Sequence, residues 1–306
     1  MNIFVIIVTY NPKQWIDKCL GSLKESLCFV RTIVVDNNST DGSKDYIRKN
    51  FPEVILLENT LNLGFGKANN IGIKKAYESG ADYVFLLNQD AWVNHDTIKD
   101  LVQAHQKEPD FGIVSPMHLN GKGTAFDYNF SNYINPAKCK NLYSDIFLNT
   151  IKKKIYKIEF VNAAAWLISK KCIEVVGGFN PSFFHYGEDN NYLQRVEFHQ
   201  FKIGVCPNSI VYHDRETNSE NSYFINQEKF YIRNVVLKVS NPTNKYSFEI
   251  EYRKSYMFLC KALFSFRLKK IKEVLCKIKA LNHLDRKQII NNRIESCKPQ
   301  SSFLNL

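Results

Sequence analysis

The sequence lacks a long apolar run. Its longest apolar stretches, Asn2 to Tyr10 and Tyr256 to Phe266, are too short or are interrupted by Lys261, whereas a membrane-spanning helix needs roughly 20 apolar residues. The N-terminus also lacks the basic segment and the small-residue cleavage site of a secretion signal. These absences lead us to expect a cytoplasmic protein.

The sequence also lacks paired cysteines. Eight cysteines are spread over 306 residues without a Cys-x-x-Cys pair, so neither a zinc site nor a disulfide framework is indicated. We therefore expect reduced thiols, most of them buried. Apolar residues, by contrast, are plentiful: 44% of the chain is hydrophobic and 13% is aromatic, which is enough to close a core in a chain of this length.

Apolar and amphipathic segments alternate through residues 1–115. The apolar runs predict strands at 3–8, 32–35, 54–57, 83–87 and 112–114, and the amphipathic runs predict helices at 14–26, 42–49, 66–79 and 96–107. Strands of this kind, interleaved with helices, predict a Rossmann-like α/β fold with a mainly parallel sheet covered on both faces. Residues 119–158 lose the pattern and predict a long loop or an edge excursion. The turn signal at 241–244 predicts a boundary between a domain at 1–240 and a helical basic region at 241–306.

Polar residues follow each of the first four predicted strands. They are Thr9-Tyr10-Asn11 after the first, Asp36 to Gly42 after the second, Asn62 to Asn70 after the third and Asn88-Gln89-Asp90 after the fourth. In an open α/β sheet, ligands bind at the carboxyl ends of the strands. One such end would be an ordinary turn, but four together predict a nucleotide cleft. A dinucleotide fold is disfavoured, because Asn69 stands where the Gly64-x-Gly66 pattern needs a third small residue.

Five motifs occur in order: VTYNP, VVDNNSTDGS, NLGFGKANNIG, LLNQD and FFHYGED. Together they resemble family 2 of the nucleotide-sugar glycosyltransferases, which have the A-type glycosyltransferase (GT-A) fold, and especially the bacterial members that add rhamnose or galactose to cell-surface polysaccharides. The resemblance covers roughly residues 1–240. It implies an inverting enzyme that moves a hexosyl or deoxyhexosyl group from a UDP-sugar or dTDP-sugar to a glycan acceptor. Lipid-linked acceptors are common in this family.

The resemblance also implies a donor site and a metal site. The residues expected around the nucleotide sugar are Thr9, Tyr10, Asn11, Asp36, Asn38, Gly64, Lys67, Asn70, Asn88 and Gln89. Asp90 matches the last acid of the family's D-x-D motif, and His213 falls where relatives have a metal-ligating histidine, with Asp214 expected to orient its ring. An Mg²⁺ or Mn²⁺ ion there stabilises the leaving diphosphate. One aspartate is enough, because Mg²⁺ needs only one or two carboxylates besides phosphate oxygens.

Two adjacent acids, Glu188 and Asp189, stand at the start of a predicted helix. Acids at this position also compensate the helix dipole and its free amides. The resemblance implies instead that Asp189 is the general base that takes the proton of the acceptor hydroxyl, while Glu188 shapes the acceptor side. Asn191 departs from the family pattern, which commonly has a further acid there. Trp166 is expected either to stack on the acceptor sugar or to be a buried core residue.

The positive charge is concentrated near the C-terminus. Of a net charge of +11, residues 253–280 carry +8, from nine lysines and arginines and one glutamate. Apolar residues recur in this region at intervals of four and three, which predicts a helix with an apolar stripe: Phe264, Leu268, Ile271, Leu275 and Ile278. Such a helix is expected to contact the inner face of an anionic membrane, or to pack on the catalytic domain or on a second subunit of a homo-oligomer. No nucleic-acid module is recognised, so we do not expect a nucleic-acid partner.

Two other functions compete with a transferase. A sugar nucleotidyltransferase would begin with a glycine-rich loop for a triphosphate, and VTYNPKQW has no glycine. A non-catalytic module that binds nucleotide sugars or glycans would not need both acidic constellations. The sequence therefore predicts a metal-dependent glycosyltransferase of surface polysaccharide synthesis.

Overall fold

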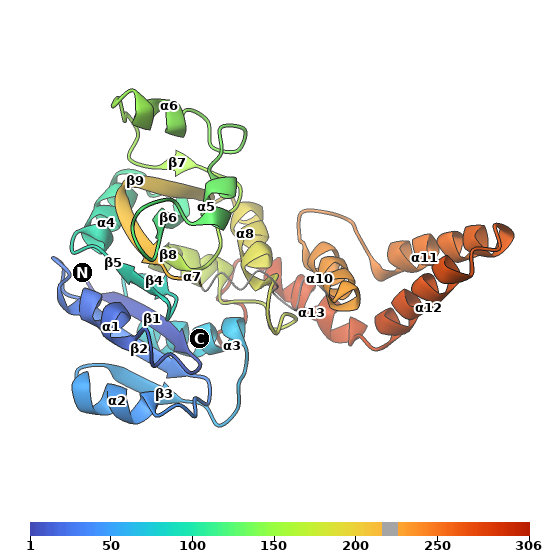
Figure 1. Ribbon diagram of the computed structural model, residues 1–306, viewed down its shortest axis with the longest axis horizontal. Coiled ribbons are helices and arrows are strands. Elements are labelled where there is room, and N and C mark those ends of the chain that lie inside the picture. Colours follow the sequence, from blue (N-terminus) through green and yellow to red (C-terminus); the bar gives the residue numbers. More distant parts are fainter. Residues whose placement is uncertain (216–225) are drawn as a thin grey trace.

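The chain forms a body built on a β-sheet and a set of helices that extends to one side of it. The computed structural model describes residues 1–215 and 226–306. In Figure 1 the C-terminal helices lie beyond the sheet; they are α10 (Gln227–Ser240), α11 (Phe248–Phe264), α12 (Leu268–Asn282) and α13 (Arg286–Ser296). Among the helices in the described ranges, none is long and apolar enough to cross a membrane.

The first half of the sheet is parallel. Its strands lie in the order β3 (Ile55–Glu58), β2 (Arg31–Asp36), β1 (Ile3–Thr9) and β4 (Tyr83–Leu87). The helices that cover it are α1 (Ile16–Lys24), α2 (Ser43–Asn50) and α3 (Phe65–Glu78). Phe4 and Ile6 of β1 pack in the core shared with α3, whereas Val5 and Ile7 pack in the core shared with α1 and α2. Burial on both faces explains why these strands are apolar without alternation.

The second half of the sheet is mixed. Its strands are β5 (Ala91–Val93), β6 (Phe111–Asn120), β8 (Ala165–Ser169) and β9 (Lys202–His213). β8 runs antiparallel between β4 and β6, β9 is parallel to β6, and β5 is antiparallel to β9. The last pairing sets Ala91 opposite His213, so the residues that follow β4 lie next to the end of β9. The predicted α/β class is confirmed, with the longest parallel part at β3-β2-β1-β4.

Residues 121–158 leave the sheet and return to its edge. They form α5 (Tyr128–Tyr133), α6 (Leu142–Phe147) and the short strand β7 (Tyr156–Lys157), which pairs with β9. The segment is the predicted edge excursion. Asp127 anchors its start: the backbone N–H of Asp127 donates to the carbonyl of His118 in β6 at 2.9 Å, and its carboxylate caps α5 by accepting from the N–H of Phe130 at 2.9 Å.

The C-terminal helices share a small core. It draws residues from all four helices and from the loop before α8 (Glu188–Phe198): Phe183, Val235, Val236, Val239, Phe248, Leu281 and Ile289. Helix α10 therefore packs with the helices that follow it, and Phe183 connects this group to the body. The division into 1–240 and 241–306 stays a prediction.

The predicted single stripe from Phe264 to Ile278 is wrong, because these residues belong to two helices. Helix α11 ends at Phe264, and the chain reverses at Phe266, whose φ of 51° is left-handed. The N–H of Arg267 donates to the carbonyl of Ala262 at 3.0 Å, as in a Schellman C-cap, where glycine is usual. With phenylalanine in that position, the sequence carries no signal for the turn.

The last residues of the chain return to the body. The N–H of Gly178, just after α7 (Lys170–Val176), donates to the carbonyl of Ser302 at 2.8 Å. Leu304 is buried in the core that includes α3, and Lys74 of α3 donates to the carbonyl of Asn305 at 2.5 Å. The tail thus ties the C-terminal helices to α3 and to the end of α7.

Candidate active site

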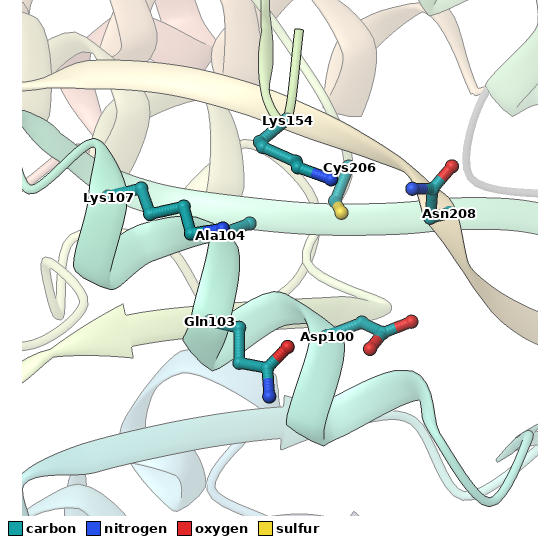
Figure 2. Close-up of a pocket in the computed structure, with 7 residues that line it drawn as sticks. All are labelled: Asp100, Gln103, Ala104, Lys107, Lys154, Cys206 and Asn208. Atoms are coloured by element: carbon teal, nitrogen blue, oxygen red, sulfur yellow. The ribbon is translucent and has the colours of Figure 1, made fainter. Parts of the chain in front are cut away.

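One surface pocket lies away from the strand ends. Figure 2 shows it between α4 (Thr97–Lys107) and β9, lined by Asp100, Gln103, Ala104, Lys107, Lys154, Cys206 and Asn208. None of these residues belongs to the motifs that follow the first four strands. The candidate site therefore has to be built from the strand ends themselves.

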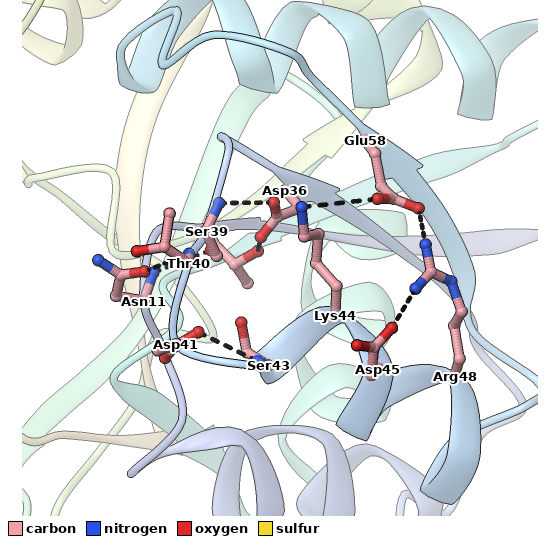
Figure 3. Close-up of polar contacts among 11 residues, drawn as sticks. Asn11, Asp36, Ser39, Thr40, Asp41, Ser43, Lys44, Asp45, Arg48 and Glu58 are labelled. Carbon is pink, nitrogen blue, oxygen red and sulfur yellow. Dashed lines mark hydrogen bonds and ion pairs between the residues drawn. The ribbon is translucent and has the colours of Figure 1, made fainter.

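The loops after β1 and β2 are cross-linked by the side chains predicted to hold the nucleoside (Figure 3). Asp36 is fully buried, and its two oxygens accept from the Ser39 N–H at 2.8 Å and from the Thr9 hydroxyl at 3.1 Å. Asn11 accepts from the N–H of Thr40 at 2.9 Å, and its own N–H donates to the Ser39 hydroxyl at 2.9 Å. The carboxylate of Asp36 thus supports the loop from beneath, and its place around the nucleotide stays a prediction.

The exposed positions of these loops are Tyr10 and Asn38. Tyr10 is 51% exposed, and Gln89 clasps its backbone by accepting from the Tyr10 N–H at 2.7 Å and donating to its carbonyl at 3.2 Å. Asn38 is exposed with a left-handed φ of 69°. The Gln89 clasp joins the ends of β1 and β4, so Tyr10, Asn38 and the half-buried Asn88 lie along the same edge of the sheet.

The loop after β3 contacts the segment that precedes α8. Gly64 has a φ of +79°, and a Cβ there would lie 2.1 Å from the carbonyl oxygen of Phe184, so no other residue fits without movement. Lys67 is exposed on α3, where its ammonium remains able to meet a phosphate. Asn70 requires a correction: its amide accepts from the Phe179 N–H at 2.6 Å and donates to the Phe179 carbonyl at 2.8 Å. It binds the protein's own loop and not a nucleotide.

Asp90 and His213, the two predicted metal ligands, face each other. Asp90 Oδ1 lies 3.3 Å from His213 Nε2, and the Asp90 carboxylate is 23% exposed while the imidazole is buried. On the other side of the ring, His213 Nδ1 lies 3.3 Å from Asp127 Oδ2. Arg215 Nε also contacts that oxygen, at 2.8 Å. The arrangement is a row of four side chains whose two ends, Asp90 and Arg215, are both partly exposed.

Charge partners decide the protonation of this row. Burial acts to raise the pKa of Asp127, but the hydrogen bond from His213 and the positive charge of Arg215 lower that pKa below its usual value. Burial acts to lower the pKa of His213, whereas its hydrogen bonds to Asp127 and Asp90 raise it. The two carboxylates beside the ring therefore favour the protonated form of His213.

Asp127, and not Asp214, orients the imidazole. The carboxylate of Asp214 accepts from the indole N–H of Trp15 at 3.3 Å, which corrects the prediction that this neighbour in sequence supports His213. The sequence does mark Asp127 as a helix cap before Tyr128. It gives no sign that the cap faces His213, because that contact depends on the pairing of β6 with β9.

The donor set of this row fits a divalent cation that arrives with a diphosphate. Within the described part of the chain, no group of three or more His, Cys, Asp or Glu side chains is arranged to hold a metal ion. Asp90 and His213 supply one carboxylate oxygen and one ring nitrogen. Phosphate oxygens and waters ordinarily complete the coordination shell of Mg²⁺ or Mn²⁺. Two protein ligands would therefore leave coordination positions for the diphosphate.

The second acidic cluster begins α8. Gly187 has a φ of +104°, which suits the sharp turn that points Glu188 and Asp189 inward. Glu188 is buried, and its Oε2 has no hydrogen-bond partner within residues 1–215 and 226–306. Asp189 is half-buried, and its Oδ1 accepts from the N–H of Asn190 at 2.7 Å.

Burial dominates the protonation of this second cluster. It raises the pKa of Glu188 to about 7, with a further contribution from the negative charge of Asp189. Burial also raises the pKa of Asp189, against the Asn190 N–H and the charges of Arg233 and Arg215. A carboxylate that gives up its proton less readily also accepts one more readily, as a general base requires.

Arg233 of α10 lies beside this cluster. Its guanidinium donates to the Asn190 side chain at 2.8 Å, and its stem lies 3.4 Å from where a Cβ of Gly187 would stand. The sequence did not assign Arg233 to the site. The structure adds Arg233 to the site, because its positive charge, carried by α10, acts on both Glu188 and Asp189.

Charges from both acidic clusters act on one phenol, that of Tyr133. Burial raises the pKa of Tyr133 to about 12, and it is modified by Arg215, Asp189, Asp127 and Arg233 in that order. Arg215 acts on Asp189 as well as on Asp127. The Asp127–Arg215 part of the first row and the Glu188–Asp189 pair therefore lie near enough to Tyr133 for their charges to act on it.

Trp166 is a core residue and not a platform for a sugar. It is fully buried, and its ring stacks on Phe179 with centroids 6.2 Å apart and also contacts Tyr192 at 5.7 Å. The expected stacking on an acceptor is thus wrong, because β8 lies in the middle of the sheet and places the indole in the interior. The alternative of a buried core tryptophan is the one found.

Comparison with known proteins gives a consistent result. The family model described as Glycosyl transferase family 2 matches residues 4–176. The low-salt glycan biosynthesis hexosyltransferase Agl10 of Haloferax volcanii is 25% identical over 227 residues, which cover 72% of this chain and 70% of that protein. The dTDP-rhamnosyl transferase RfbF of Shigella flexneri is 26% identical over 221 residues, which cover 69% of each chain.

The fold is also found among solved structures. The crystal structure of Staphylococcus aureus TarS 1–349 in complex with UDP-GlcNAc superposes with a TM-score of 0.59 at 18% sequence identity. The superposition covers 97% of this chain and 84% of that one. The likeness therefore extends through the C-terminal helices, beyond the part matched by the family model.

Proposed function

Because the chain belongs to glycosyl transferase family 2, we propose that it transfers a hexosyl or deoxyhexosyl group from a UDP-sugar or dTDP-sugar to a glycan acceptor, with inversion at the anomeric carbon. The observation that supports this most is that two unlike acidic clusters lie near enough to each other for Arg215 to act on carboxylates of both. One cluster suits a metal and a diphosphate, and the other suits proton removal. A module that only binds sugars would need neither arrangement.

Asp90 and His213 are the proposed metal ligands. A bound Mg²⁺ or Mn²⁺ would supply a Lewis acid for the negative charge of the leaving diphosphate. The ring of His213 would present Nε2 to the cation in place of the proton it shares with Asp90. Asp127 would keep the ring in this orientation from the Nδ1 side. Tyr10, Asn38, Asn88 and Lys67 are the proposed contacts for the rest of the donor.

Asp189 is the proposed base. Its Oδ1 is held by the N–H of Asn190, which leaves Oδ2 to take the proton of the acceptor hydroxyl. The hydroxyl oxygen then forms the new bond to the anomeric carbon as the bond from that carbon to the diphosphate oxygen breaks. Glu188, beside it, would keep the acceptor side of the cleft closed to bulk water.

The names of the relatives favour a glycan as the product. RfbF is named for dTDP-rhamnose transfer and Agl10 for glycan biosynthesis, so we propose surface polysaccharide synthesis with a lipid-linked acceptor. The nucleotide sugar and this acceptor are the proposed partners, and the cytoplasm remains the predicted location.

The proposal can be tested by screening donors. Thermal shift with a panel of UDP-sugars and dTDP-sugars, each with and without Mn²⁺, should show stabilisation by one donor class that depends on the metal, since a ligand stabilises the folded state by mass action. The same donor should then be consumed in the presence of a polyprenyl-diphosphate-linked sugar. Stabilisation without consumption over a broad acceptor panel would favour the binding module instead, and stabilisation by nucleoside triphosphates would favour a nucleotidyltransferase.

A further inference from the structure

The hairpin of α11 and α12 exposes large apolar side chains at its tip. Phe264, Phe266 and Leu268 are 86%, 89% and 79% exposed, although they stand within five consecutive residues. Figure 1 shows that the hairpin extends away from the sheet body. Such a cluster would be costly in water without a partner, so its place at the far end of the hairpin suggests that the tip meets another surface.

The flanks of the same hairpin are strongly basic. All nine lysines and arginines between residues 253 and 280 are exposed: Arg253, Lys254, Lys261, Arg267, Lys269, Lys270, Lys272, Lys277 and Lys279. Glu273 is the one acid between residues 253 and 280. The partner surface should therefore combine negative charge with an apolar interior.

We propose that the α11–α12 tip docks on an anionic lipid bilayer, with Phe264, Phe266 and Leu268 inserted among the acyl chains near the headgroups. Apolar side chains that enter the interface and basic side chains that meet anionic lipids each add to binding. The backbone supports this reading, since Phe266 occupies a left-handed position that suits glycine or asparagine better. An aromatic ring is kept there at a cost in local backbone energy.

Two other partners fit the hairpin less well. A second copy of the chain would bring two surfaces of net charge +8 together, and their repulsion opposes pairing. A nucleic acid would meet the charge and could stack bases on Phe264 and Phe266, but it would leave the aliphatic side chain of Leu268 in water. A bilayer satisfies both the charge and the apolar tip.

The first experiment measures vesicle flotation of the full chain. Vesicles of phosphatidylcholine alone should bind little protein, whereas vesicles that also contain phosphatidylglycerol should bind it, with a loss of binding as salt increases. This measurement needs no donor or acceptor, so its outcome is independent of the proposed reaction.

Paired variants separate the apolar and the charged contributions. Phe264→Ser with Phe266→Asn should lower the vesicle partition coefficient by about tenfold or more, and asparagine suits the left-handed backbone, so folding should be retained. Lys269→Glu with Lys270→Glu should lower it by about 25-fold or more. Matched controls elsewhere in the chain are Phe29→Ser and Phe147→Ser, whose rings are 82% and 88% exposed, and the exposed pair Lys140→Glu with Lys152→Glu.

Each result decides for or against the tip. The proposal holds if the tip variants lose binding and the controls keep it, with unchanged circular dichroism. It is overturned if tip and control variants bind alike or if neutral vesicles bind as well as anionic ones. The proposal is also overturned if the protein forms a dimer that the tip variants abolish. The same holds if the protein retards RNA or DNA in a gel but does not bind vesicles.

Discussion

Carboxylates in the two acidic clusters have pKa values shifted in opposite directions. Asp127 is buried, yet the hydrogen bond from His213 and the charge of Arg215 keep its pKa below the ordinary value. Glu188 is also buried and Asp189 is half-buried, but the charges near them do not offset the burial, and their pKa values are raised. Burial therefore does not decide the role of an acid by itself; the charge partner beside it does. In the proposed reaction, the row that includes Asp127 would supply fixed charge, and the pair on α8 would exchange a proton.

The largest expected effect comes from removing the proton acceptor. Asp189→Asn should lower kcat by about a thousandfold, because a general base typically contributes this much, while donor binding measured by calorimetry stays unchanged. Glu188→Gln is the matched control on the same turn and should lose far less activity. Equal rates for the two variants would remove Asp189 from the proposed role.

The next effect concerns the metal ligand on the opposite side. Asp90→Asn should lower kcat by about a hundredfold, the scale of losing one stabilising contact to the developing charge, and chelation with EDTA should abolish transfer in the unmodified protein. Because Asp90 and His213 are the two ligands proposed among the described residues, Mn²⁺ should bind weakly until the nucleotide is added. Electron paramagnetic resonance of Mn²⁺ with and without UDP measures this, and tight binding to the nucleotide-free protein would contradict an open site.

A smaller effect is expected from the carboxylate behind His213. Asp127→Asn should weaken Mn²⁺ binding in the presence of nucleotide by about 10- to 100-fold, and excess Mn²⁺ should restore much of the activity. Asp214→Asn is a matched control, because that carboxylate contacts Trp15. If Asp214→Asn were the more damaging change, the orientation of the imidazole would have been assigned to the wrong neighbour.

The smallest effect is a displacement of the pH profile. The base works only when ionised, so the raised pKa of Asp189 should place the acid limb of kcat/KM above that of an ordinary aspartate. Arg233 lowers this pKa, and Arg233→Gln should therefore move the acid limb to higher pH, whereas Arg233→Lys should leave it nearly in place. A limb that moves to lower pH in Arg233→Gln would show that Arg233 does not act through its charge on the base.

The sequence predicted the fold well where the pattern is local. The strands at 3–8, 32–35 and 83–87 are buried on both faces and therefore read as continuous apolar runs, and they are present as β1, β2 and β4. The turn at Phe266 was missed because no residue there marks the end of a helix. A phenylalanine stands where a glycine would have marked the end of the helix.

For the site, residue types were more predictable than partners. The pattern identified Asp90, His213, Glu188 and Asp189 as candidates. The structure places Asp90 beside His213 and Glu188 beside Asp189, and their roles stay predictions. It did not identify Asp127, which becomes the support of His213 only when an excursion between two strands folds over the end of β9. Asn70 was misread because the loop it binds lies more than a hundred positions away.

The sequence by itself determined where strands end in polar residues and which acids stand there, since both follow from short-range periodicity and residue chemistry. Only the tertiary structure decided what those residues do. Asp36 and Asn70 accept hydrogen bonds from backbone groups of the protein, Trp166 is enclosed in the core, and Asp127 is paired with His213. Burial and the nearest charge set the behaviour of a side chain, and neither is defined until distant segments of the chain have packed together.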